Sequence, residues 1–354
     1  VSTVYNLDWP KTKNNASKQK QELTQLMDKL KGCGINTIVL QVRPESDALY
    51  KSSINPWSKY LTGTQGKDPG YDPLAFAIQE AHKRGMELHA WMNPYRVTSS
   101  GTDLNSLVSS HPARKNPSWV IKYNNKMYYD PGNPAVVDYL VKTVKEVVDK
   151  YDVDGIHFDD YFYPSSSFPD DASYKAYGKG QDRNNWRREN VNTLLKKVKA
   201  VVNARSGCEF GVSPFGIWRN GESIGGSNTR GLSSYEDIYV NSRKWIKEGY
   251  LDYIVPQIYW QFNNSNAPYT TLVDWWSNQV EGTNIQLYIG IAVYKINDST
   301  YGQEWLKDDE VINQIIYSRN DKNVKGNCFF RLASLEENRL GFTDKLKSLY
   351  EKNK

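Results

Sequence analysis

The stretch Asp154-Gly155-Ile156-His157-Phe158-Asp159-Asp160-Tyr161-Phe162-Tyr163-Pro164 places two adjacent aspartates at the end of a short apolar run. Helical patterns flank it, with apolar residues at three-and-four spacing within 137–148 and again within 191–202. A short apolar run between two amphipathic helices is typical of a buried parallel strand with helical crossovers. We therefore expect a strand at 155–160 that delivers Asp159 and Asp160 to a loop.

The same alternation of strand and helix extends along the whole chain. Strand-like runs occupy residues 1–8, 36–43, 87–93, 155–160, 209–215, 253–260, 286–294 and 325–333, and a helical pattern follows each of them. Eight such units predict an α/β fold, a (β/α)8 TIM barrel with parallel strands. The length of 354 residues fits one barrel domain, residues 1–354.

The predicted connections differ in length. Links from helix to strand are short, as at 31–35 and 150–154, whereas links from strand to helix are long, at 44–72, 94–133 and 161–184. In a TIM barrel the strand-to-helix loops gather at the carboxyl ends of the strands, where active sites lie. Adjacent aspartates are also common in solvated turns, but their place on this edge favours a functional pair. Mutual repulsion raises the pKa of one such carboxyl group and leaves the other ionised, as acid catalysis beside a charged carboxylate requires.

Polar and aromatic side chains accompany the other predicted strand ends. Side-chain alternation along strands predicts that His89 and His157 point to the same side as Asp159. Aromatic rings pack against the C–H faces of sugars while amides and carboxylates bind hydroxyls, so these strand ends favour a glycan ligand. The predicted substrate-binding residues are Arg43, Glu45, His89, Trp91, Asn93, Tyr95, Arg96, His157, Tyr161, Trp218, Gln257, Tyr259 and Trp260. Packing between sheet and helices is the alternative for the aromatic members, and a salt bridge with Glu45 or Asp47 is the alternative for Arg43.

Composition narrows the range of functions. The 45 basic and 40 acidic residues give a net charge of only +5, so we predict no nucleic-acid partner. The four histidines form no helical pair and no Cys/His cluster, and no phosphate-binding glycine loop is present, so we predict neither a metal nor a cofactor. The sequence contains no apolar run of about 18 residues, so we predict no membrane-spanning segment. Because the chain begins inside the apolar run 1–5, we expect that its N-terminus is trimmed.

Motifs spread over nearly the whole chain resemble those of the glycosyl hydrolase-like 10 family. They include Asn6-Leu7-Asp8-Trp9-Pro10, Gln41-Val42-Arg43-Pro44, His89-Ala90-Trp91-Met92-Asn93-Pro94-Tyr95-Arg96, Trp186-Arg187-Arg188, and the segments 153–164, 213–218 and 256–260. The resemblance implies a barrel in a secreted or lipid-anchored bacterial envelope protein, and some relatives act on peptidoglycan glycan strands that lack stem peptides. The expected location is therefore extracellular or in the cell envelope, and the expected partner is a polysaccharide or peptidoglycan glycan.

A more distant resemblance concerns the mechanism. Phe158-Asp159-Asp160 resembles the strand-four aspartate pair of hexosaminidases that use the substrate's own acetamido group as nucleophile. Asp154-Gly155-Ile156 is similar to the chitinase strand-four motif, but the catalytic glutamate of chitinases is absent. These resemblances imply that Asp160 is the general acid/base and that Asp159 orients the acetamido group and stabilises developing positive charge.

The expected function is hydrolysis of a bacterial envelope glycan that contains N-acetylhexosamine, foremost peptidoglycan strands lacking stem peptides. Two alternatives remain open. The first is a retaining glycosidase for a different polysaccharide, with Asp159 as nucleophile and Glu45 or Asp160 as acid. The second is a non-catalytic barrel that binds envelope glycan.

Overall fold

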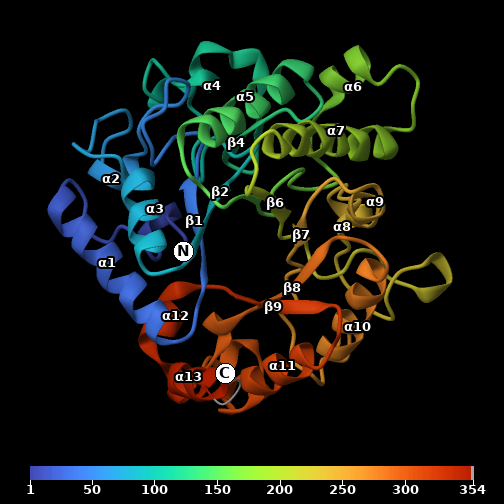
Figure 1. Ribbon diagram of the computed structural model, residues 1–354. Helices are drawn as coiled ribbons and strands as arrows, with labels where there is room; N and C mark the ends of the chain where they lie inside the picture. The colour runs from blue at the N-terminus through green and yellow to red at the C-terminus, as the bar shows by residue number, and fades with distance from the viewer. Residues whose placement is uncertain (352–354) are drawn as a thin grey trace.

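The computed structural model describes residues 1–351 and is built around one parallel sheet of seven strands in chain order. The strands are β1 (Thr37–Arg43), β2 (Glu87–Met92), β5 (Gly155–Phe158), β6 (Glu209–Val212), β7 (Tyr253–Ile254), β8 (Gln286–Ile291) and β9 (Val324–Phe329). The sheet curls and helices surround it on the outside, as in a TIM barrel (Figure 1). Seven of the eight predicted strands are confirmed, at or near their predicted positions.

The prediction of a first strand at residues 1–8 is wrong. Val4–Asn6 forms a 3-10 turn instead. Within it Tyr5 and Asn6 have φ values of 57° and 52°, in the left-handed region that a β-strand does not use. The (β/α)8 description therefore holds only in its coarser form, a TIM-like sheet in which residues 1–351 supply seven strands.

The N-terminal segment nevertheless lies between the first and last strands. The Val1 ammonium donates to the carbonyl of Val39 in β1 at 2.8 Å, and Val1 O accepts from Gln41 N at 3.0 Å. At its other end, Asp8 accepts a hydrogen bond from the Arg331 guanidinium, two residues beyond β9, at 3.0 Å. An irregular segment thus occupies the position in which an eighth strand was predicted.

Helices follow the strands and cover the outer face of the sheet (Figure 1). In α5, Asn133 caps the N-terminus by accepting from Ala135 N at 3.0 Å, and Pro134 occupies the first turn, where its missing N–H is not needed. The α-helices are α1 (Ala16–Gly32), α2 (Lys59–Thr62), α3 (Pro73–Lys83), α4 (Pro112–Lys115), α5 (Pro134–Lys150), α6 (Asp171–Tyr177), α7 (Arg183–Asn203), α8 (Ser234–Asp237), α9 (Ser242–Glu248), α10 (Tyr269–Val280), α11 (Glu310–Arg319), α12 (Leu332–Glu337) and α13 (Phe342–Glu351). No helix within residues 1–351 is both long enough and apolar enough to cross a membrane.

Three ring side chains meet in the interior of the curled sheet. The Tyr253 hydroxyl is hydrogen-bonded to Nδ1 of His89 at 2.8 Å and to Nδ1 of His157 at 2.9 Å. Gly155 and Gly211 make room for this cluster, because a Cβ atom at either position would collide with the ring of His89 or Tyr253. Burial lowers the pKa of His157 to about 3, so the imidazole is neutral within this interior.

The long loops after the strands contain a structure that sequence patterns did not predict. Between β2 and α5 the chain forms the antiparallel hairpin β3 (Val120–Tyr123) and β4 (Lys126–Tyr129). Tyr129 N donates to Tyr95 O at 2.8 Å, and Val97 N donates to Met127 O at 2.9 Å. The hairpin therefore fixes the backbone of the loop that leaves β2.

Candidate active site

Asp159 and Asp160 directly follow β5 at the carboxyl edge of the sheet, and only 5% and 7% of their surfaces are exposed. Oδ2 of Asp159 accepts hydrogen bonds from the indole nitrogen of Trp91, at 3.0 Å, and from the side-chain amide of Asn93. Oδ1 accepts from the backbone N–H of Tyr161 at 3.3 Å. Burial raises the pKa of Asp159, while these donors and the charge of Arg96 oppose that rise because they stabilise the carboxylate.

Asp160 is the member of the pair that holds a proton most strongly. Burial, followed by the charge of Asp159, raises the pKa of Asp160 to about 8. The neighbouring Gln257 side chain opposes this rise, and its amide donates to Ser213 O at 3.0 Å. The proton of the pair at neutral pH is therefore assigned to Asp160, while the hydrogen-bond donors to Asp159 and the charge of Arg96 favour the carboxylate form of Asp159.

A chain of amide groups orients Asn93 toward Asp159. The Gln41 side chain donates to Oδ1 of Asn93 at 2.5 Å, so the NH2 group of Asn93 is the part that faces Asp159. Gln41 is fully buried, and its Oε1 accepts from the backbone N–H groups of Thr3 and Val4, both at 2.9 Å. Gln41 was absent from the predicted site residues and was named only within the motif Gln41-Val42-Arg43-Pro44. Its position on β1 beside Trp91 of β2 was the available signal for a role at the site.

An aromatic wall stands beside the pair and consists of Trp91, Tyr259, Tyr294 and Phe330. Phe330 is its centre: its ring stacks on Tyr259 with centroids 6.3 Å apart and meets Tyr294 and Trp91 edge-on at 5.9 Å and 6.5 Å. All four rings are partly exposed. Since Trp91 also donates to Asp159, the wall and the carboxylate are held in one arrangement. Phe330 was absent from the predicted set, although it directly follows β9.

Arg96 and Tyr161 form a stacked pair on the same edge. The guanidinium carbon of Arg96 lies 4.6 Å from the centroid of the Tyr161 ring, and Tyr161 is 50% exposed. The Tyr161 backbone N–H is the donor to Asp159, so the stacked pair adjoins the carboxylates. Arg96 and Tyr161 thus lie next to the aspartate pair, and their contact with a sugar stays a prediction.

Arg43 faces away from the site, contrary to its prediction. A bulge near the end of β1 shifts the register, so that Arg43 aligns with Met92. The side-chain alternation of β1 is therefore interrupted before Arg43. Its buried guanidinium donates to the Tyr139 hydroxyl of α5 at 3.1 Å and to carbonyls of the loop after β2. The alternative salt bridge with Glu45 or Asp47 is also absent from the described chain.

Glu45 lies outside the immediate surroundings of the pair as well. Its buried carboxylate accepts from Lys59 Nζ at 2.7 Å and from Ser99 N at 2.6 Å, so both oxygens have partners within the protein. Its role in the structure is to hold together the loops that follow β1 and β2. The expectation that it contacts sugar, or serves as the acid, is therefore corrected.

Three further predicted residues pack in the interior. His89 bonds Tyr253 and lies 3.6 Å from Glu87 at the start of β2, which places it toward the opposite edge of the sheet. Tyr95 is fully buried and packs edge-on against Phe162, at 6.4 Å. His157, also buried, shares a hydrogen bond of 2.7 Å with the Ser213 hydroxyl. His157 supports the residues that precede Asp159 and is not positioned to touch a sugar.

Two predicted tryptophans differ in position. Trp218 is 5% exposed and stacks on Trp275 of α10 at 5.7 Å, so the packing alternative applies to it. Trp260 is partly exposed and its ring lies against Gly216, where a side chain would collide with it. Contact of Trp260 with a sugar remains a prediction.

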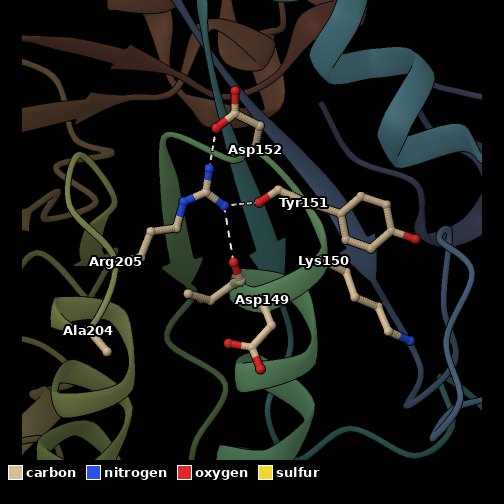
Figure 2. Close-up of a pocket in the computed structure, with 7 residues that line it drawn as sticks. Asp149, Lys150, Tyr151, Asp152, Ala204 and Arg205 are labelled. Atoms are coloured by element: carbon tan, nitrogen blue, oxygen red, sulfur yellow. Dashed lines mark hydrogen bonds and ion pairs between the residues drawn. The ribbon is translucent and has the colours of Figure 1, made fainter.

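Other candidate positions lie away from the pair. Residues 1–351 contain no group of three or more His, Cys, Asp or Glu side chains placed to hold a metal ion. An open surface hollow of about 450 Å³ lies at the ends of α5 and α7, near the amino end of β5 (Figure 2). Arg205 spans it, donating to Val148 O at 3.1 Å, to Tyr151 O and to Asp152. Arg205 is already bonded within the protein, and the aspartate pair lies at the opposite, carboxyl edge of the sheet. This hollow is therefore not the candidate active site.

Comparison with known proteins places this arrangement in context. A model of the glycosyl hydrolase-like 10 family matches residues 1–307. The chain is 48% identical to glycosyl hydrolase YngK of Bacillus subtilis (strain 168), in an alignment that covers 99% of this chain and 71% of YngK. It is 41% identical to glycosyl hydrolase DigH of Escherichia coli (strain K12), with 94% of this chain and 81% of DigH covered.

Solved structures share the fold at low sequence identity. The glycoside hydrolase domain of PgaB from Bordetella bronchiseptica superposes with a TM-score of 0.59 at 11% identity, covering 98% of this chain and 95% of that domain. Alpha-L-fucosidase isoenzyme 2 from Paenibacillus thiaminolyticus gives a TM-score of 0.57 at 12% identity, covering 93% of this chain and 46% of the fucosidase. At these identities the similarity is one of fold alone.

Proposed function

The chain belongs to the glycosyl hydrolase-like 10 family and is a glycoside hydrolase, and from that premise we propose that it cleaves a bacterial envelope glycan containing N-acetylhexosamine. The substrate we propose is the glycan strand of peptidoglycan from which stem peptides have been removed, cleaved internally. A location outside the cell or in its envelope is part of this proposal, since the substrate is there.

The observation that carries the proposal is the unequal environment of the buried aspartate pair, in which Asp159 accepts hydrogen bonds from Trp91, Asn93 and the Tyr161 N–H and Asp160 lies next to it. A general acid must hold a proton at neutral pH, and Asp160 does so because burial and Asp159 raise its pKa to about 8. In our proposal Asp160 protonates the glycosidic oxygen of the leaving sugar and later accepts a proton from the attacking water. Gln257, whose amide donates to Ser213 O, lies beside the acid and favours its later ionised form.

Asp159 serves as the charged partner in this proposal. A carboxylate held by Trp91, Asn93 and the Tyr161 N–H cannot rotate freely. It can accept a hydrogen bond from the acetamido N–H of the bound sugar while the carbonyl oxygen of the same acetamido group attacks the anomeric carbon. The same negative charge stabilises the positive charge that develops in the transition state. Substrate assistance of this kind is a recognised exception to the two-carboxylate scheme.

The aromatic wall supports the assignment of a sugar ligand. Rings of Trp91 and Tyr259 beside the acid offer apolar faces for the C–H side of a pyranose ring. The retaining alternative, with Asp159 as direct nucleophile, uses the same residues but needs no acetamido group on the substrate. Its version with Glu45 as acid is disfavoured, because that carboxylate is bonded to Lys59 and Ser99.

The test is to incubate wild type and Asp160→Asn with amidase-stripped and intact peptidoglycan, and to follow soluble fragments and new reducing ends by mass spectrometry. We expect fragments from stripped strands with wild type alone, with turnover of the variant reduced by at least about 100-fold. Circular dichroism and retention on the strands show whether the variant still folds and binds. Unchanged turnover in Asp160→Asn would remove Asp160 from the acid role, and binding without fragments from wild type would favour a glycan-binding function.

A further inference from the structure

Arg96 has a cationic group that the protein leaves without a polar partner. Its guanidinium stacks on Tyr161, yet within residues 1–351 its nitrogens make neither a hydrogen bond nor an ion pair. Other arginines stacked on tyrosine differ: Arg187 is paired with Asp170 at 2.5 Å, and Arg219 with Glu236 at 2.5 Å. The donors of a guanidinium form a planar fork that matches a carboxylate, so the fork of Arg96 is available to a ligand.

The backbone that carries Arg96 is fixed by contacts with two other segments of the chain. Arg96 pairs with Tyr128 of the β3–β4 hairpin in an antiparallel bridge, and Tyr129 N donates to Tyr95 O next to it. The Ser46 hydroxyl donates to the Arg96 carbonyl at 2.6 Å. A side chain that leaves a fixed backbone and rests on an aromatic ring is pre-organised, which reduces the ordering entropy lost when it binds a ligand.

The position of this fork beside the carboxylates has a chemical consequence. An anionic ligand group near Asp159 meets a like charge, which repels it unless a cation lies close by. Arg96 supplies that cation: its charge acts on both Asp159 and Asp160, yet no nitrogen lies within ion-pair distance of either in the described chain. The guanidinium can therefore screen the pair and still bind a second carboxylate.

Resting on the function proposed above, we infer that Arg96, supported by Tyr161, binds the free carboxylate of an acidic amino sugar next to the scissile bond. In peptidoglycan this group is the lactyl carboxylate of N-acetylmuramic acid. A stem peptide converts the carboxylate to an amide, which removes the charge and adds bulk at the same point. Recognition by Arg96 thus gives a physical reason for preferring stripped strands over intact peptidoglycan.

The experiment separates charge from bulk. Stripped strands are divided in two, and one half is coupled to methylamine with a carbodiimide, which turns each lactyl carboxylate into a small neutral amide. We measure kcat/KM on both for wild type, Arg96→Gln, Arg96→Lys and the control Arg219→Gln, an arginine with the same 4.6 Å stacking distance on a tyrosine but with an acidic partner. Affinity of the Asp160→Asn protein for both kinds of strand is the second readout.

We expect wild type and Arg219→Gln to prefer the carboxylate strands by about tenfold or more, as the loss of charge-assisted hydrogen bonds implies. Arg96→Gln should abolish this preference and Arg96→Lys should restore part of it. A preference for carboxylate strands that survives in Arg96→Gln, or that is absent in wild type, overturns the inference. In either case, cleavage of both kinds of strand by wild type still supports the proposed function. If wild type cleaves neither strand, the proposed function fails, and the Asp160→Asn affinities still decide whether Arg96 selects the carboxylate.

Discussion

At the scale of single residues, the protonation of Asp160 sets the pH range in which the enzyme can work. The acid form of Asp160 is required, so kcat/KM should fall as the pH rises through about 8, the value to which burial and Asp159 raise its pKa. Asp159 must be ionised for its role. Because burial raises the pKa of Asp159 too, activity should be lost on the acidic side at a pH above the usual pKa of a carboxyl group. We expect a bell-shaped profile on stripped strands. An alkaline limb that is unchanged in Asp160→Asn would mean that another group is the acid.

Gln41 is a positioning residue that should affect turnover without touching the substrate. Gln41→Leu removes the hydrogen bond that orients Asn93, so Asp159 loses a correctly placed donor. We expect kcat to fall by about 10- to 100-fold with KM little changed. The acidic limb of the pH profile should move to higher pH, because a carboxylate with fewer donors has a higher pKa.

The control for this prediction is Gln19→Leu, a change at a buried glutamine whose side chain bonds the Thr12 and Leu61 carbonyls and the Tyr71 hydroxyl. It should lower stability without a selective effect on kcat or on the pH profile. If both variants lose turnover only in proportion to their loss of folded protein, Gln41 has a structural role alone.

At the scale of elements, sequence patterns located strands well and side-chain directions less well. The alternation used to group His89 and His157 with Asp159 does not extend to Arg43, because a one-residue bulge in β1 shifts the register there. Period-two patterns carry no signal for a bulge. The β3–β4 hairpin was missed for a related reason, since four-residue strands that pair outside the main sheet show little periodicity.

The bulge leads to a prediction for Arg43. Arg43→Met keeps the aliphatic length but leaves the Tyr139 hydroxyl and loop carbonyls without their donor. We expect a loss of about 1–3 kcal/mol in the free energy of unfolding, measured with urea, because these buried acceptors lose their hydrogen bonds. KM for stripped strands should stay within about twofold of wild type. A large rise in KM with unchanged stability would return Arg43 to the substrate-binding set.

At the scale of the whole molecule, the order of strands and helices was predictable because each unit repeats the same apolar pattern over a long stretch. The closure of the ring was not, because residues 1–8 are apolar enough for a strand while Tyr5 and Asn6 adopt left-handed backbone angles. Contacts between the two ends of the chain determine the conformation of residues 1–8. A local sequence pattern gives no information on contacts between residues more than 300 positions apart.

Asp8 links the N-terminal segment to the chain beyond β9. Its fully buried carboxylate accepts from Ser2 N at 2.8 Å and from both Arg331 and Ala333 N at 3.0 Å, and so joins the N-terminal segment to the chain beyond β9. Asp8→Ala should therefore lower the free energy of unfolding by about 3 kcal/mol, because an arginine and two N–H groups lose their acceptor.

The effect of Asp8→Ala should also reach the catalytic pair, since the segment it anchors supplies the Thr3 and Val4 N–H groups that hold Gln41. Kinetics on folded protein should thus show a lower kcat in the same direction as Gln41→Leu. Asp308→Ala is the control, because that aspartate forms an exposed ion pair with Lys345 and its loss should leave both stability and kcat nearly unchanged. Stability lost without any change in kcat would show that ring closure and the orientation of Asp159 are independent.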